Sequence, residues 1–140
     1  MSTELSAALA AEEAAIYAYG TLGVKLTSDS DQTEARAAEQ AHRERRDALV
    51  LRLAALKASA APAPAGYELP FPVTDRAGAL KLAIQVEDGV AQAWRAVLPV
   101  TREGDRSTAL SALTDAAVRA TRWRKRAKVT PLTMAWPGRA

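Results

Sequence analysis

Apolar residues recur at alternating steps of four and three positions in four stretches of the chain. These stretches lie near residues 3–26, 31–59, 75–98 and 105–128. This spacing places the apolar side chains on one face of an α-helix. The inward face of the first stretch includes Leu5 and Leu9, and that of the fourth is expected to include Leu110 and Leu113. The pattern predicts an all-α fold.

Turn and breaker residues separate these stretches into two pairs. The polar run Thr27–Asp31 separates the first two, and Pro99 and Gly104 bracket a short turn between the last two. Short turns favour antiparallel neighbours, so each pair is expected to form a helical hairpin. Residues 60–74 contain several prolines and cannot be helical, because proline lacks an N–H donor and forces the preceding residue toward extended conformations.

The long middle connection suggests how the hairpins are joined. A proline-rich segment of about 15 residues reaches about 45 Å, whereas a helix of about 24 residues is about 36 Å long. The segment can therefore run along a whole bundle. This predicts a ferritin-like four-helix bundle, with two antiparallel hairpins joined by one long crossover. The predicted single domain spans residues 1–140, with the crossover at about 60–74 and an irregular tail at about 129–140. An up-and-down bundle with a loose loop is the alternative.

The composition excludes several kinds of catalytic and metal-binding site. The chain has 140 residues and no cysteine, which excludes disulfides, thiolate zinc sites and cysteine nucleophiles. His42 is the sole histidine, so a site that needs two imidazoles is excluded. No phosphate-binding loop, serine triad or dinucleotide-binding motif is present.

Polar residues interrupt the apolar faces. They are Glu12, Glu39, His42, Arg46 and Glu87. Counting residues from the predicted turns places Glu12, His42 and Glu87 at one level near the middle of the bundle. Burying carboxylates costs several kcal/mol unless they are paired or bind a metal. The positions therefore predict a buried polar cluster.

Two interpretations of this cluster compete. A ferritin-like metal site would use Glu12, Glu39, His42 and Glu87 to hold iron or manganese, with Asp115 as a fourth-helix contributor. The absence of a second Glu-x-x-His and the charge of Arg46 oppose it. The other interpretation is a metal-free cluster of Glu12, His42, Arg46 and Glu87, in which Arg46 or Arg45, together with His42, satisfies the carboxylates. We favour the second, with no cofactor.

The C-terminal part of the chain is basic. Residues 119–140 contain seven basic residues and no acidic one. A basic surface is predicted from Arg119, Arg122, Arg124, Lys125, Arg126 and Lys128. Such a segment can bind nucleic acid or an acidic partner, but basic residues also complement the C-terminal end of a helix dipole. We favour the helix-dipole interpretation, with Trp123 packed inward.

Location and assembly follow from simpler signals. Residues 1–11 contain no basic residue, so they do not resemble a signal peptide, and no apolar run approaches the roughly 20 residues that span a bilayer. A cytoplasmic protein without membrane association is expected. Gly78 and Gly89 allow close helix approach, and we expect a homo-oligomer, a dimer, through exposed helix faces.

Several segments resemble a known family. They are Leu9–Gly20, His42–Asp47, Gly66–Pro70, Ala93–Val97 after Glu87, and Ala117–Trp123. Together they are similar to an uncharacterised ferritin-like family found mainly in actinobacteria, and the similarity covers nearly the whole chain. The resemblance implies a four-helix ferritin-like bundle and no established activity. It implies that the shared pattern includes Glu12, His42, Arg45, Arg46, Asp47, Glu87 and Asp115, but not Glu39.

The sequence leaves three functional hypotheses. The leading one is a non-enzymatic helical protein with a degenerate metal site. The second is an iron- or manganese-binding protein with ferroxidase-like or oxidoreductase activity. The third is a module that binds a partner or nucleic acid through the basic C-terminal segment.

Overall fold

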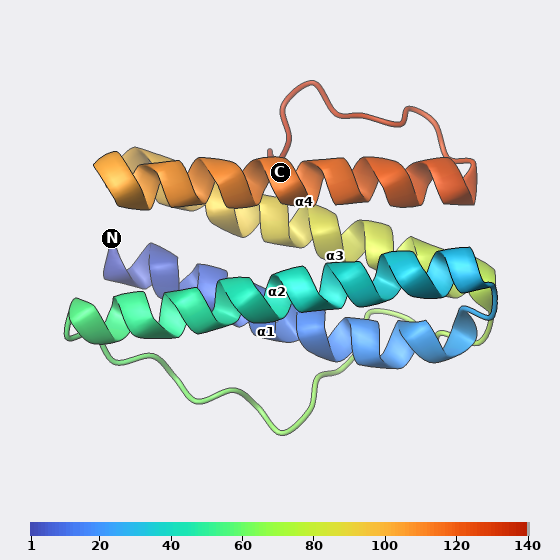
Figure 1. Ribbon diagram of the computed structural model, residues 1–140, viewed down its shortest axis with the longest axis horizontal. Coiled ribbons are helices and arrows are strands. Elements are labelled where there is room, and N and C mark those ends of the chain that lie inside the picture. The colour runs from blue at the N-terminus through green and yellow to red at the C-terminus, as the bar shows by residue number, and fades with distance from the viewer. Residues whose placement is uncertain (140) are drawn as a thin grey trace.

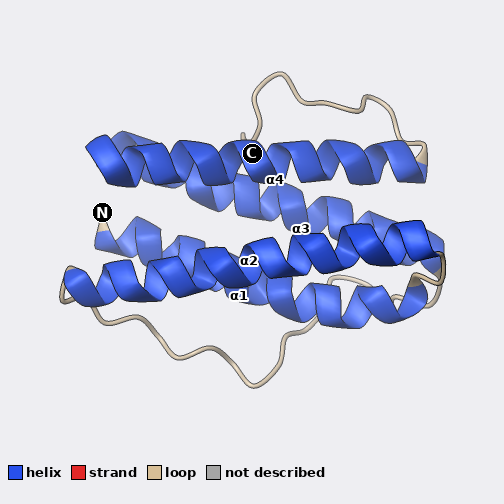
Figure 2. Cartoon of the chain, viewed as in Figure 1, coloured by secondary structure: helices blue, strands red, loops and turns tan. Residues whose placement is uncertain are grey.

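The computed structural model describes residues 1–139, and within them every regular element is helical (Figure 2). The four α-helices are α1 (Ser2–Leu22), α2 (Asp29–Ala55), α3 (Arg76–Val97) and α4 (Glu103–Ala127). Short 3-10 helices, η1 (Gly23–Lys25) and η2 (Leu98–Val100), follow α1 and α3. The expectation of an all-helical chain with four helices is confirmed.

The helices lie side by side along one long axis (Figure 1). α1 and α2 run in opposite directions, as do α3 and α4. Residues 56–75 are not helical, so the connection is longer at both ends than the predicted 60–74. They pass along the outside of the bundle, and α3 begins at the end of the bundle where α2 also begins (Figure 1).

Local sequence explains where the helices begin and end. Ser28 and Asp75 cap α2 and α3, since their side chains accept hydrogen bonds from the backbone N–H groups of Asp31 and Gly78. α2 ends at Ala55, before the predicted end near residue 59, because Lys57 takes a left-handed conformation with φ of 54°. The N–H of Ala58 then bonds to the carbonyl of Leu53, which closes a Schellman motif without glycine.

The core is built from alanine, leucine and two tryptophans. α4 contributes Ala109, Ala112, Ala116, Ala120 and Trp123, all almost completely buried. The expected inward face of α4 is wrong at Leu110, which is 55% exposed. Small alanines fill most of the face of α4 that meets the other helices, so Ala109 lies inward where Leu110 was expected, whereas Leu113 is buried as expected.

Ion pairs bridge the gap between α2 and α4. Arg52 binds Asp105 through two hydrogen bonds of 2.8 Å, and Arg45 binds Asp115 at 2.7 Å. Near the other end of α4, Arg126 reaches across to α2. Arginine side chains therefore join the two helices along most of their length, whereas apolar side chains fill the centre of the bundle.

Candidate functional site

The predicted polar residues Glu12, His42 and Glu87 come together at the centre of the bundle. They lie on α1, α2 and α3, and none is more than 1% exposed. His42 Nδ1 lies 2.5 Å from Glu12 Oε2, and His42 Nε2 lies 2.7 Å from Glu87 Oε1. The imidazole therefore joins two carboxylates that belong to different helices.

Two aromatic side chains donate hydrogen bonds to these carboxylates, and a third donates to one of the two. Trp94 Nε1 donates to Glu12 Oε1 at 2.7 Å, and the hydroxyl of Tyr19 donates to Glu87 Oε1 at 2.9 Å. Trp123 Nε1 in turn donates to the Tyr19 oxygen at 2.8 Å. The Tyr19 ring also stacks on His42, with centroids 5.7 Å apart. Among residues 1–139, no buried polar atom of this group lacks a partner.

Arg119 supplies the second positive charge. Its Nε donates to both oxygens of Glu87, at 3.1 and 3.3 Å, and its side chain is 13% exposed. The prediction that Arg46 or Arg45 fills this role is wrong: Arg46 bonds to its neighbour Asp47 and its side chain is 32% exposed, and Arg45 bonds to Asp115. We call Glu12, His42, Glu87 and Arg119, with Tyr19, Trp94 and Trp123, the central cluster.

The central cluster holds His42 in its charged form. Burial alone would lower the pKa of His42, but hydrogen bonds and the charges of Glu12 and Glu87 outweigh burial and raise it to about 9. An imidazole can donate from both ring nitrogens only when it is protonated. His42 and Arg119 therefore place two cationic side chains against the carboxyl groups of Glu12 and Glu87.

Burial also keeps the phenol of Tyr19 protonated. Removal from water, together with the adjacent negative charge of Glu87, raises the pKa of Tyr19 well above its ordinary value. The neutral hydroxyl can therefore donate to Glu87 while it accepts from Trp123.

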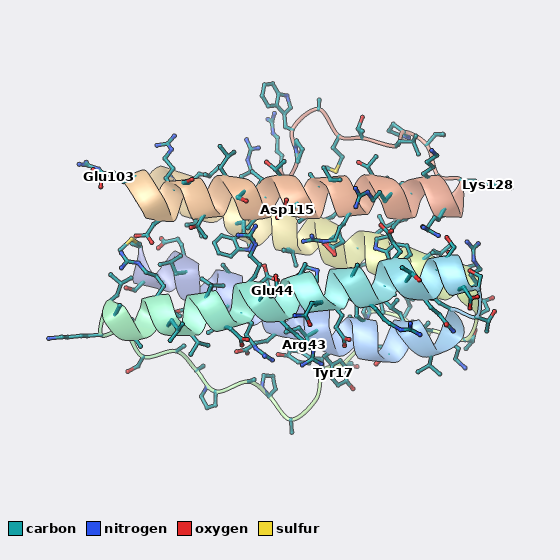
Figure 3. The ribbon with its side chains drawn as sticks, viewed as in Figure 1. Tyr17, Arg43, Glu44, Glu103, Asp115 and Lys128 are labelled. Carbon is teal, nitrogen blue, oxygen red and sulfur yellow. The ribbon has the colours of Figure 1, made fainter. Side chains whose placement is uncertain are left out.

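Two residues of the predicted metal site lie elsewhere. Glu39 is half-buried on α2 and pairs with Arg43 at 3.5 Å, one turn away from His42. Asp115 lies midway along α4 (Figure 3), where its side chain is 49% exposed and binds Arg45. Within residues 1–139, no group of three or more histidine and acidic side chains has an arrangement that could hold a metal ion.

The predicted basic surface is largely neutralised in the structure. Arg119 is inside the bundle, Arg124 pairs with Asp88, and Arg126 pairs with Asp31 and Glu34. Lys125 and Lys128 are exposed, while Arg122 is 61% exposed and lies 3.9 Å from Glu34. Trp123 packs inward as expected, with no measurable exposure.

A third buried carboxylate, that of Asp31, was not predicted from the sequence. Asp31, in the first turn of α2, is 1% exposed. Arg76 of α3 contacts it at 2.6 Å and Arg126 of α4 at 2.9 Å. The hydrogen bond from Arg76 contributes most to lowering the pKa of Asp31. We call these three residues the end cluster, because they join the helices at one end of the bundle.

Comparison with known proteins places the chain in a family. The family described as a domain of unknown function, DUF4439, matches residues 4–140. The chain belongs to this family. A crystal structure of a conserved hypothetical protein, rv2844, from Mycobacterium tuberculosis is similar: the sequences are 40% identical, and the TM-score is 0.84 over 89% of this chain and 94% of that chain. No curated protein shows a significant match.

The family assignment agrees with the expected resemblance to an uncharacterised family. Neither match names a ligand, a reaction or a partner. Within residues 1–139, none of the helices is both long enough and apolar enough to cross a membrane.

Proposed function

We propose that this chain is a non-enzymatic, ferritin-like four-helix protein in which the central cluster occupies the place of a metal centre. Ferritin-like bundles bind two metal ions through carboxylates and histidines that project inward from the helices. Glu12, His42 and Glu87 occupy such inward positions on three helices. The parallel directions of α2 and α3, joined by a long connection, support the ferritin-like topology over an up-and-down bundle.

The hydrogen bonds of His42 are the observation that carries the proposal. Both of its ring nitrogens face carboxylate oxygens, so neither offers a lone pair to a metal ion. Arg119 lies against Glu87, and a fixed positive charge there opposes binding of a cation. The residues present do not fit an iron or manganese centre, so we derive no reaction through one.

The cluster has a structural role in this proposal. Each of its charged side chains comes from a different helix, and each makes hydrogen bonds to at least one of the others. A shifted helix would leave a buried charge unpaired, which costs several kcal/mol. The cluster therefore fixes the register of all four helices. This role needs neither a substrate nor a cofactor.

Metal binding is the direct test. The purified chain is incubated anaerobically with ferrous iron, and separately with Mn²⁺, then desalted and measured for metal by mass spectrometry. We expect less than 0.1 equivalent to be retained. Retention of one or two equivalents, lost in Glu12→Gln and His42→Gln but kept in the matched Glu39→Gln variant, would contradict the proposal and favour oxygen chemistry.

Location and assembly remain part of the proposal. We place the protein in the cytoplasm, which agrees with the absence of cysteine. A homodimer is supported by apolar side chains on outward helix faces, such as Leu51, which is 73% exposed. Sedimentation analysis of the wild type and of Leu51→Glu measures whether that face joins two copies.

A further inference from the structure

The C-terminal tail forms one wall of an open pocket on the outer side of α3 and α4. Residues 128–139 leave the end of α4 and fold back over the bundle (Figure 1). Between the tail and the two helices lies a pocket of about 530 Å³. This volume lies within the range of about 300–1,000 Å³ that small-molecule sites occupy. The pocket shares no residue with the central cluster.

Two arginines and one glycine fasten the tail over this pocket. Arg95 Nη1 donates to the carbonyl of Pro137 at 3.0 Å, and Arg124 contacts the sulfur of Met134 at 3.7 Å. Gly138 has φ of 77°, and a Cβ added there would lie 2.6 Å from the carbonyl oxygen of Ala91. The tail backbone therefore packs directly on α3 at a position that accepts only glycine.

Most of the pocket wall is apolar. Ala91 of α3, Leu113, Ala117 and Val118 of α4, and Met134 of the tail line it. The hydroxyl of Thr121, which also lines the pocket, donates to the carbonyl of Ala117 in its own helix. An occupant of this volume would therefore gain stability by burying an apolar body.

The charged groups at the pocket do not balance. Asp88 and Arg124 pair with each other, so together they contribute no net charge. Arg95 and Arg122 line the same pocket. Arg122 lies 3.9 Å from Glu34, whereas no carboxylate of residues 1–139 lies within ion-pair distance of Arg95. One of its five N–H donors is used on Pro137. A positive charge with spare donors thus lies beside an apolar volume.

We infer that this pocket binds a small amphiphilic monocarboxylate of the fatty-acid class. The carboxylate would pair with Arg95, which suits planar carboxylates, and the hydrocarbon would lie between α4 and the tail. Charge complementarity selects the head group, and the apolar wall selects the body. This inference goes beyond the proposed function and does not depend on the central cluster.

Calorimetric titration of the full chain with decanoate, below its critical micelle concentration, tests the inference. We expect saturation at one equivalent, and binding of decyltrimethylammonium to be at least 10-fold weaker. Arg95→Gln should weaken decanoate binding about 10-fold, whereas Arg95→Lys should stay within about threefold. Ala117→Phe, which fills the pocket, and Gly138→Val, which displaces the tail, should abolish binding.

The matched control is Arg106→Gln, which removes an exposed arginine on the neighbouring helix α4, away from the pocket. It should bind decanoate as the wild type does. No saturable binding at millimolar decanoate, equal binding of the cationic amphiphile, or unchanged binding by Ala117→Phe would overturn the inference. If Arg95→Gln fails to fold by circular dichroism, Arg95→Lys and Ala117→Phe decide the outcome. Metal binding at the central cluster would leave these results unaffected.

Discussion

The central cluster and the end cluster both bury a carboxylate almost completely, but they do so by different means. Glu12 and Glu87 are paired with a histidine that is itself fully buried and can lose its proton. Asp31 is paired with Arg76 and Arg126, whose side chains are partly in water and whose charges are permanent. The central cluster is therefore sensitive to pH and to truncation, whereas the end cluster can exchange its partners for water.

Removal of His42 should produce the largest effect. In His42→Ala, Glu12 and Glu87 remain buried without their shared partner, and breaking a buried ion pair in this way costs about 3–5 kcal/mol. We expect this loss in the free energy of unfolding, measured by urea denaturation with tryptophan fluorescence. The comparison between the clusters fails if His42→Ala costs no more than Asp31→Asn.

Alkaline pH should weaken the central cluster next. The pKa of His42 is about 9 in the folded protein and about 6.5 when unfolded, so its contribution is complete below pH 6.5 and is lost as pH rises through 9. The loss is on the order of 3 kcal/mol, because one pKa unit corresponds to about 1.4 kcal/mol. Urea midpoints measured from pH 6 to 10 should fall for the wild type and stay flatter for His42→Gln.

Replacing a buried and an exposed arginine should change the free energy of unfolding by different amounts. Arg119→Met removes the guanidinium that contacts Glu87 and should cost about 1–3 kcal/mol. Arg46→Met changes a residue that bonds only to exposed Asp47 and should cost less than about 0.5 kcal/mol. Thermal unfolding of both variants measures the difference. Equal losses would show that Arg119 is not part of the charge balance.

The smallest effect is expected at the end cluster. Asp31→Asn should cost about 1 kcal/mol, since Arg76 and Arg126 can turn to solvent. The pKa of Asp31 is lowered, so its contribution is present above the unfolded pKa of about 3.9 and is lost as pH falls through the lower folded value. Acid titration should therefore destabilise the wild type more steeply than Asp31→Asn. Parallel curves would contradict this assignment.

The sequence predicted part of the central cluster and missed the rest for a definable reason. Counting residues from the predicted turns was enough to predict that Glu12, His42 and Glu87 lie at the same level of the bundle. Tyr19, Trp94 and Trp123 also belong to the central cluster. Trp123 was expected to pack inward, but the polar atoms of these residues were not considered as donors. A buried tyrosine or tryptophan usually needs a partner for its O–H or N–H, and that rule was the available signal.

Arg119 and Asp31 gave no comparable signal. Arg119 lies in a run of basic residues, and the run suggested a solvent-exposed face. Asp31 lies in a polar turn, where an aspartate is ordinary near the start of a helix. Their burial depends on the rotation of α4 and on the position of α3, which bring Glu87 and Arg76 into reach.

The sequence by itself determined the four helices and the proline-rich break between the two helix pairs, because these depend on local residue patterns. It also determined the common level of Glu12, His42 and Glu87, because that level follows from counting residues along each helix. Only the tertiary structure decided which cation pairs with the carboxylates, that Arg124 and Arg126 are paired, and that the tail forms one wall of a pocket. These outcomes depend on the rotation of each helix about its axis. That rotation follows from how alanine-rich faces pack together, which a one-dimensional pattern does not specify.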